Sequence, residues 1–108
     1  MDVKISSSPV RLTVFLSGEL DHHSAASMRA QTDKAIIEST ARLIRLDFGQ
    51  ITFMDSSGIG FVMGRYRLAH SKGAQVEVTN LTKKYLQIMK LAGLEKLVSL
   101  KSAQEVNR

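Results

Sequence analysis

The sequence predicts an α/β fold with a mixed, mainly parallel β-sheet. Apolar residues recur with a period of two in some segments, as in strands, and with the spacing of one helical face in others. These two kinds of segment alternate along the chain, in the predicted order ββαβαβαβα. Such alternation builds parallel sheets through right-handed crossovers, here with about four helices packed against the sheet.

The first two predicted strands form an N-terminal hairpin. The segment Val10–Gly18 alternates in the manner of a strand with one buried face, and Gly18 is expected to end it. The preceding residues, DVKIS, are interpreted as its partner strand, because the intervening SSP favours a turn.

A helix and a third strand are predicted next. His23–Ser39 is rich in residues compatible with a helix, and Ser24 is expected to be its N-cap. The predicted buried face of this helix carries Met28, Thr32, Ala35 and Ile36. Arg42–Phe48 returns to the strand pattern, with one side formed by Ile44, Leu46 and Phe48.

The second half of the chain repeats the alternation. A second amphipathic helix is predicted from Ile59 onwards, with a buried face formed by Ile59, Val62, Met63, Tyr66 and Ala69. Lys72–Asn80 is interpreted as a turn and a strand. Thr82 is expected to cap a third helix, which Gly93 follows. The apolar face of that helix carries Tyr85, Ile88, Met89 and Ala92.

The C-terminal end is predicted to add one strand and one helix. The residues KLVSL, Lys96–Leu100, are interpreted as a short strand. The final segment, Ser102–Arg108, is interpreted as the start of a last helix.

Length and composition indicate one globular domain spanning residues 1–108, with 44% hydrophobic and 23% charged residues. The absence of Cys excludes disulfides, thiolate zinc sites and cysteine nucleophiles. No apolar run approaches the roughly 18 residues that span a bilayer, and the N-terminus lacks the features of a signal peptide. We therefore expect a cytoplasmic protein without a membrane-spanning segment.

The net charge of +5 makes nucleic acids and acidic proteins the partner classes to consider. The basic residues are dispersed, and aromatic residues make up only 6% of the chain. We therefore expect a mildly basic, solvated surface. An acidic protein partner is the next interpretation, and direct binding to nucleic acid is not expected.

The turn Asp55-Ser56-Ser57-Gly58 combines an acid with two hydroxyls where a predicted strand gives way to a helix. Functional groups gather at such places in α/β sheets. Taken alone, these residues favour a helix cap, in which either serine accepts a backbone hydrogen bond. A nucleophilic serine is not expected, because the G-x-S-x-G pattern is absent. Gly58 and Gly60 allow close backbone approach and leave room for a partner surface.

A phosphate on this turn would change the surface strongly. It carries about −1.5 to −2 charges, and the positive end of the following helix favours it. Asp55 would oppose it. We therefore expect the fold to tolerate this modification while the surface charge changes.

A second polar cluster, GELDHH at Gly18–His23, precedes the first predicted helix. Acids beside histidines are a pattern that can indicate a metal site. Adjacent histidines point in different directions, however, and the H-E-x-x-H pattern is absent. A polar loop that leads into the helix is therefore favoured over a metal site. The segment GIGFVMG lacks the G-x-x-x-x-G-K-[ST] pattern, so a P-loop NTPase is not expected.

Together, SGELDHHSA at Ser17–Ala25 and TFMDSSGIGFVMGRYR at Thr52–Arg67 resemble the anti-sigma factor antagonists. These proteins are the bacterial branch of the STAS domain family, and the resemblance is to the sporulation type in particular. The separation of the motifs and the element order agree with that family along almost the whole chain. The resemblance implies a single STAS domain with a small mixed sheet.

The resemblance also implies a function. Family members bind an anti-sigma factor and thereby free a sigma factor, which is sigma F in sporulation. The anti-sigma factor is also a serine kinase that phosphorylates the antagonist with ATP, and a phosphatase restores the antagonist. By this resemblance the protein is a kinase substrate rather than an enzyme, needs no cofactor of its own, and is phosphorylated on Ser56.

The resemblance extends to the residues around Ser56. Those implied to lie near the phosphorylation site or to contact the partner are Asp21, Asp55, Ser57, Gly58, Gly60 and Arg65. Asp21 matches an acidic residue near the phosphorylation turn, and Ser57 is a cap or turn residue. We expect the kinase surface to accept unmodified Ser56 and to repel its phosphate.

Three other interpretations stay open. The protein could be an antagonist of the general-stress sigma pathway, although LDHH and GRY favour the sporulation branch. It could be a nucleotide-binding STAS protein, because the turn could hold a phosphate. A nucleic-acid binder rests on the net charge alone.

Overall fold

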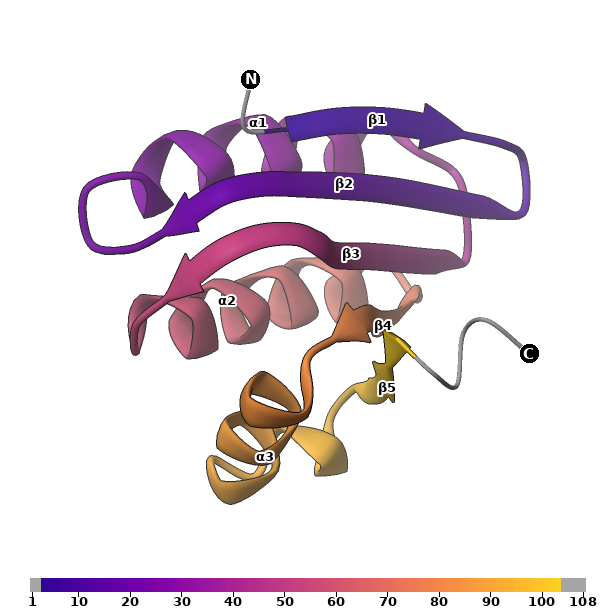
Figure 1. Ribbon diagram of the computed structural model, residues 1–108. Helices are drawn as coiled ribbons and strands as arrows, with labels where there is room; N and C mark the ends of the chain where they lie inside the picture. The colour runs from indigo at the N-terminus through magenta and orange to yellow at the C-terminus, as the bar shows by residue number, and fades with distance from the viewer. Residues whose placement is uncertain (1–2, 104–108) are drawn as a thin grey trace.

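Five strands form one sheet in the computed structural model, which describes residues 3–103 (Figure 1). In sheet order they are β1 (Val3–Ser7), β2 (Arg11–Leu20), β3 (Leu43–Met54), β4 (Gln75–Leu81) and β5 (Ser99–Ser102). β1 runs antiparallel to β2, and the other neighbouring strands are parallel. The predicted mixed, mainly parallel sheet with an N-terminal hairpin is confirmed.

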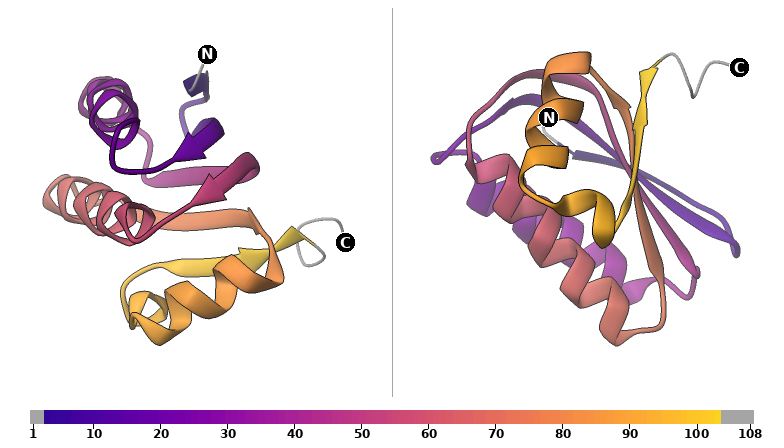
Figure 2. Two further views of the ribbon diagram at one scale, coloured as in Figure 1. Left: turned by 60° about the vertical axis from the view of Figure 1, so that its left-hand side comes forward. Right: turned by 90° about the horizontal axis from the view of Figure 1, so that it is seen from below.

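Two long helices cover one face of the sheet. α1 (Ala25–Glu38) and α2 (Ser57–Ser71) lie side by side on that face (Figures 1 and 2). α3 (Lys83–Leu91) packs against β4 and β5 instead, and a short 3₁₀ helix (Leu94–Lys96) follows it. Residues 3–103 thus contain three α-helices, where about four were predicted for the whole chain.

The core lies between the sheet and the two long helices. Strand side chains alternate between two faces, and the inward ones of β2 and β3 include Leu12, Val14, Leu16, Ile44, Leu46 and Phe48. The predicted helical faces are confirmed for the buried residues Met28, Thr32, Ile36, Val62 and Ala69. The face of α3 is confirmed for Met89, whereas Ala92 is exposed because the helix has already ended at Leu91.

Gly18 does not end its strand, so that prediction is wrong. β2 continues to Leu20, and Gly18 has a positive φ of 88° within it. The β2–β3 register shifts twice, once directly after Gly18. In both shifts the extra residue lies in β3, as in a β-bulge, and Gly18 of β2 stands beside the second shift. Glycine readily adopts a positive φ of this kind. β3 likewise runs past the predicted Phe48 to Met54, because it keeps pairing with β2 beyond the shifts.

Both ends of α3 form as predicted. The backbone N–H of Tyr85 donates to Thr82 Oγ1 at 3.2 Å, which makes Thr82 the N-cap. Gly93 follows the C-cap with a φ of 83°, the left-handed conformation that glycine adopts readily.

The C-terminal predictions are met in part. Within the predicted strand Lys96–Leu100, only the last two residues belong to β5, because the chain is still leaving the 3₁₀ helix before Ser99. Ser102 ends β5 rather than opening a helix. Most of the predicted last helix falls on residues 104–108, which lie outside the described residues.

Lys72, at the C-terminal end of α2, donates hydrogen bonds to the carbonyl groups at the C-terminal end of α1. The Nζ of Lys72 donates to the carbonyl oxygens of Ile37 at 3.0 Å and of Ser39 at 2.8 Å, and also to that of Ile36. The last carbonyls of a helix lack intrahelical partners, and a cation beside them is favourable. These hydrogen bonds link the C-terminal ends of α1 and α2.

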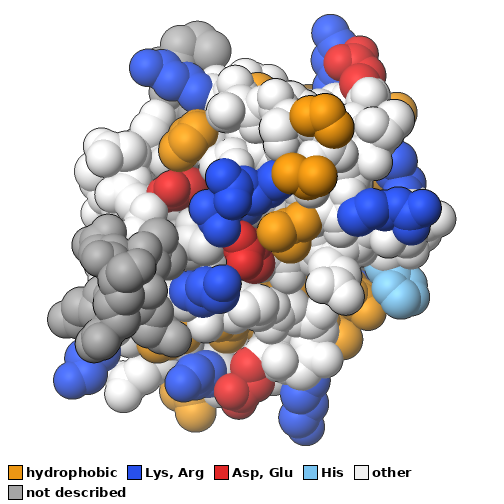
Figure 3. All heavy atoms as spheres, turned by 90° about the vertical axis from the view of Figure 1, so that its right-hand side faces the viewer, with side chains coloured by type: hydrophobic (Ala, Val, Ile, Leu, Met, Phe, Trp, Pro, Cys, Tyr) orange, Lys and Arg blue, Asp and Glu red, His pale blue; other side chains and the backbone are white. Residues whose placement is uncertain are grey.

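The face of the sheet opposite α1 and α2 carries an ion cluster. Glu77 of β4 pairs with Arg45 of β3 and with Lys101 of β5, whose Nζ lies 3.1 Å from Glu77 Oε1. Burial disfavours the charged form of Glu77, but hydrogen bonds from Arg45 and Lys101 outweigh it, so the pKa of this carboxyl is lowered. On the surface shown in Figure 3, Lys and Arg side chains are interspersed with acidic and hydrophobic ones. That view therefore shows the dispersed charge expected from the sequence.

Leu46, in the central strand and 0% exposed, provides a test of the core. Leu46→Ala should lower the free energy of unfolding by about 2–5 kcal/mol, because it removes buried methyl groups and leaves a cavity. The measurement is urea denaturation followed by circular dichroism. Ile37→Ala is the control: Ile37 is 61% exposed, so its replacement should change the free energy by no more than about 0.5 kcal/mol. Equal losses in both variants would contradict this core assignment.

Candidate functional site

The pairing of β2 with β3 brings the two polar turns of the sequence together. Leu20 and Met54, the last residues of these parallel strands, are register partners. The backbone N–H of Asp55 then donates to the carbonyl oxygen of Leu20 at 3.3 Å. Asp21 and Asp55 therefore follow neighbouring strand ends, at the edge of the sheet where functional groups gather.

The cap of α2 is made by Asp55 and not by a serine. Asp55 Oδ1 accepts the backbone N–H of Ser57 at 2.8 Å. Ser56 occupies the N-cap position, but its side chain makes no cap hydrogen bond and is exposed. The interpretation that either serine caps this helix is therefore wrong for Ser56, whose hydroxyl takes no part in the cap. Ser57 is the first residue of α2 and contributes its backbone to the turn.

Gly58 and Gly60 differ in whether the fold itself requires glycine at that position. A Cβ on Gly58 would lie 2.3 Å from Met54 Sδ and 2.4 Å from Met54 Cγ, so any larger residue there would force the Met54 side chain or the start of α2 to move. A Cβ on Gly60 would meet nothing within 4 Å. Gly58 therefore serves the fold, whereas nothing inside the described chain explains Gly60.

Asp21 organises the turn before α1. Its Oδ1 accepts the backbone N–H groups of His23 and Ser24, each at 2.9 Å. These bonds favour the carboxylate, that from the Ser24 backbone most strongly, and so lower the pKa of Asp21. Ser24 stands at the N-cap position of α1, but its hydroxyl makes no cap bond. It accepts the backbone N–H of Asp21 and donates to the carbonyl of Glu19 instead, so the predicted capping role of Ser24 is wrong.

Arg65 joins α2 to α1 inside the protein. It is 5% exposed, and its Nε lies 2.7 Å from Asp33 Oδ1. Its guanidinium also lies 5.1 Å from the centre of the Phe61 ring. Burial lowers the pKa of Arg65, Asp33 opposes this, and the charge of Arg29 lowers it further. Partner contact by Arg65 stays a prediction, which this burial disfavours.

A groove of about 550 Å³ lies beside the serines, between the N-terminal parts of α1 and α2. Its lining residues are His22, Ala25, Ala26, Arg29, Ser57, Gly60 and Phe61. Sequence reasoning missed the contribution of α1 to this region, including Asp33. One signal was present: Arg65 falls on the apolar stripe of α2, and a buried cation needs an acid from another element.

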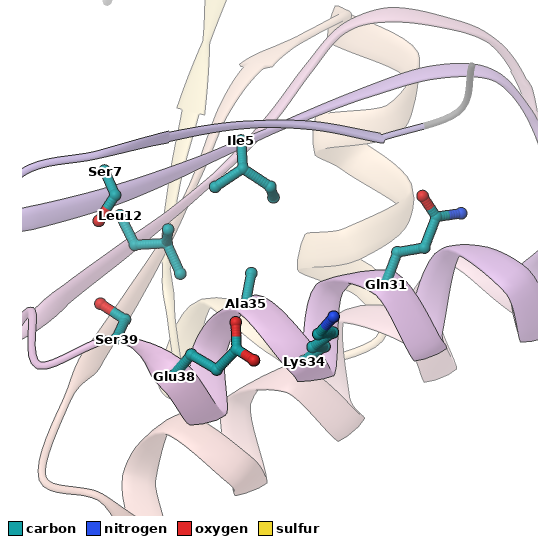
Figure 4. Close-up of a pocket in the computed structure, with 8 residues that line it drawn as sticks. All are labelled: Ile5, Ser7, Leu12, Gln31, Lys34, Ala35, Glu38 and Ser39. Carbon is teal, nitrogen blue, oxygen red and sulfur yellow. The ribbon is translucent and has the colours of Figure 1, made fainter.

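A second hollow, of about 360 Å³, lies between β1 and α1 (Figure 4). Ile5, Leu12 and Ala35 point into it, and Lys34 and Glu38 lie at its edge (Figure 4). None of the predicted site residues lines it. It is therefore separate from the turns that the sequence singled out.

Neither a metal-binding cluster nor a membrane-spanning helix is present among residues 3–103. No group of at least three His, Asp or Glu residues there is arranged to hold a metal ion. No helix in the same range is both long and apolar enough to cross a membrane.

Comparison with known proteins decides the family. The family model described as "Mlab, STAS domain" matches residues 3–99. The chain belongs to the STAS domain family. It is 38% identical to the anti-sigma F factor antagonist of Paenibacillus polymyxa over 82% of this chain and 76% of the relative. It is 24% identical to the anti-sigma-B factor antagonist of Bacillus subtilis strain 168, over 97% of this chain and 93% of the relative.

Solved structures agree with this STAS assignment. The anti-sigma factor antagonist SpoIIAA in its unphosphorylated form matches with a TM-score of 0.76 at 27% identity, covering 96% of this chain and 91% of SpoIIAA. The phosphorylated Bacillus SpoIIAA matches with a TM-score of 0.71 at 27% identity, covering 96% and 95%. The predicted resemblance to the STAS-domain anti-sigma factor antagonists is confirmed. Such antagonists are regulatory proteins rather than enzymes, which agrees with the sequence-based expectation.

The contact between Gly58 and Met54 provides a test of the turn. Gly58→Ala should lower the free energy of unfolding by about 1–3 kcal/mol, because the added methyl group overpacks the buried Met54 side chain. In a Met54→Ala background the same substitution should cost much less, since the clashing atoms are gone. Chemical denaturation of the four proteins in this cycle measures the difference. Equal costs in both backgrounds would show that the two residues do not collide.

The lowered pKa of Asp21 predicts a pH dependence of stability. A carboxyl whose folded-state pKa is lowered stabilises the fold above its unfolded pKa, and this contribution is lost as the pH falls through the folded pKa. Asp21→Asn should therefore lower the melting temperature at neutral pH, and the deficit should shrink below about pH 4. Thermal unfolding at a series of pH values measures it. A deficit that stays constant into strong acid would contradict the assignment.

Proposed function

We propose that this protein is an anti-sigma F factor antagonist of the sporulation type, switched off by phosphorylation of Ser56. The unphosphorylated form binds an anti-sigma factor that is also a serine kinase, and sigma F is released. The observation that carries the proposal is the exposed Ser56 hydroxyl, which stands at the N-terminus of α2 without taking part in the cap.

The turn suits phosphoryl transfer. The Ser56 oxygen attacks the γ-phosphorus of ATP held by the kinase, its proton leaves, and ADP departs. Asp55 keeps the start of α2 in place through the Ser57 backbone, so esterifying Ser56 breaks no cap bond. The positive end of α2 is a favourable place for the added phosphate. A phosphatase restores the serine by hydrolysis.

The effect on the partner follows from charge. A phosphate of about −1.5 to −2 charges would stand beside Asp55, close to the turn that holds Asp21. The surface around Ser56 would change from mixed to strongly anionic while the sheet and helices stay in place. A complex that tolerates the neutral serine is thereby weakened.

The sigma F assignment is supported by the sequence relatives. Identity is higher to the sigma F antagonist, at 38%, than to the sigma B antagonist, at 24%. The general-stress pathway is the second candidate, because both relatives share this domain. Since the released sigma factor directs RNA polymerase, the proposed function belongs in the cytoplasm, and it requires no cofactor in this chain.

Phosphorylation of a single serine is the first test. The protein is incubated with ATP and the anti-sigma F factor of Paenibacillus polymyxa, and in parallel with that of the sigma B pathway of Bacillus subtilis. Intact and peptide mass spectrometry should show one phosphate, on Ser56, with the sigma F kinase. Ser57→Ala is the matched control and should still gain one phosphate, whereas Ser56→Ala should gain none. A phosphate on Ser57, or on neither serine with a kinase proven active, would reject the assignment.

Partner affinity is the second test. Ser56→Ala should bind the anti-sigma F factor about as tightly as the unmodified protein, and Ser56→Asp at least about tenfold more weakly, a difference of about 1.4 kcal/mol. Isothermal calorimetry measures both. Equal binding by the phosphorylated and unmodified proteins would reject the switch. Calorimetry with ATP and GTP in the absence of kinase tests the nucleotide-binding alternative.

A further inference from the structure

The groove between α1 and α2 is open beside the phosphorylation turn. Ala25 and Ala26 of α1 and Gly60 of α2 leave it wide, and the Phe61 ring lies beneath. Its volume of about 550 Å³ gives ample room for a side chain of a partner. Ser57 also lines it, so the groove is continuous with the turn that presents the phosphorylation site.

Gly60 lies in the wall of the groove, and no contact within the described chain requires glycine at this position. Glycine in the middle of a helix destabilises it relative to alanine. Gly58 is explained by its approach to Met54, but a Cβ on Gly60 or on Gly64 would meet nothing within 4 Å. Of these two open positions, only Gly60 lines the groove. The missing methyl group there enlarges the groove.

The groove also carries positive charge in excess. Arg29 lines it, and its charge lowers the pKa of the neighbouring Arg65, because two cations repel one another. Asp33 forms the ion pair with Arg65, and no ion pair joins Arg29 to an acid among residues 3–103. His22 is the other titratable residue in the lining, which contains no acid.

Acids do stand near the mouth of the groove, but they are engaged. The Asp21 carboxylate accepts two backbone N–H groups, and that of Asp55 accepts one. Each of these carboxylates holds its own turn. Neither of them forms an ion pair with Arg29 among residues 3–103, so this cation remains available to an anion from outside.

We propose that this groove receives an acidic side chain of the anti-sigma factor, whose carboxylate pairs with Arg29 and whose aliphatic part lies against Phe61 and Gly60. This inference rests on the proposed function. A carboxylate matches the single planar guanidinium, and a short aliphatic stem matches the walls of alanine and glycine.

The same arrangement accounts for release after phosphorylation. Ser56 adjoins Ser57 in the groove wall, so a phosphate on it stands at the mouth. It repels the partner's carboxylate and competes with it for Arg29. The phosphate therefore weakens a specific charge pair in addition to making the surface anionic.

Two alanine substitutions separate docking from folding. Gly60→Ala and Gly64→Ala should both raise the melting temperature, because each adds a helix-favouring residue where a Cβ has space. Only Gly60→Ala narrows the groove, so only it should weaken binding of the anti-sigma F factor of Paenibacillus polymyxa, by about tenfold or more in calorimetry with ADP present. A more stable protein that binds less well has a changed docking surface rather than a damaged fold.

A matched pair of charge variants tests the carboxylate. Arg29→Gln should weaken binding by about tenfold and reduce its salt dependence. Arg67→Gln removes the same charge from an exposed position of α2 outside the groove, and should leave affinity nearly unchanged. Equal losses for both variants would mean that general charge attraction, and not this groove, holds the partner.

The failures of the two proposals can be told apart. If Gly60→Ala and Arg29→Gln bind as the wild type does and Ser56 is still phosphorylated, the docking proposal is overturned and the function stands. If the wild-type protein neither binds the anti-sigma factor nor is phosphorylated, the proposed function itself fails. Binding of ATP or GTP that is lost in Arg29→Gln, without any loss of partner affinity, would assign the groove to a nucleotide and overturn the carboxylate proposal.

Discussion

The parallel pairing of β2 with β3 is the constraint on which the rest of the site depends. The two strands change register twice and still end together at Leu20 and Met54. A slip of one residue would turn every following side chain to the other face of the sheet. The extra residues of β3 at these two shifts allow the polar turns after the two strands to meet at one edge. The site is thus a product of strand registration as much as of its own residues.

The two helices that leave these turns are held as one layer. Arg65 and Asp33 join them in the interior, and Lys72 joins their C-terminal ends. A buried ion pair is weak evidence for stability, since desolvation offsets the attraction, but breaking one is costly. The likeness of this chain to both unphosphorylated and phosphorylated SpoIIAA agrees with a layer that persists through modification. The phosphorylation proposed for Ser56 is accordingly argued from surface charge and not from rearrangement of the fold.

Much of the fold was predictable, because burial periodicity and turn residues are local properties. The inward side of α1, the Thr82 cap and the glycine after α3 are examples. The errors at the two polar turns came from a choice between two kinds of hydrogen-bond acceptor. Serine and aspartate both cap helices, and at both polar turns the aspartate carboxylate takes the backbone N–H groups. The role of Arg65 depended on Asp33 of another helix, so spacing along one helix could not identify it.

The empty space outside Gly60 has a consequence for how such proteins diversify. At most core positions, a change in side-chain volume is opposed by the fold before any partner encounters it. At Gly60 the fold has room for an added methyl group and does not oppose it, so we expect a limit on residue size there to come from partners. If the proposed docking holds, gene duplicates of such an antagonist can change partner by substitutions that folding does not resist. Related signalling pathways in one cell can then be kept separate without any change in the fold of the domain.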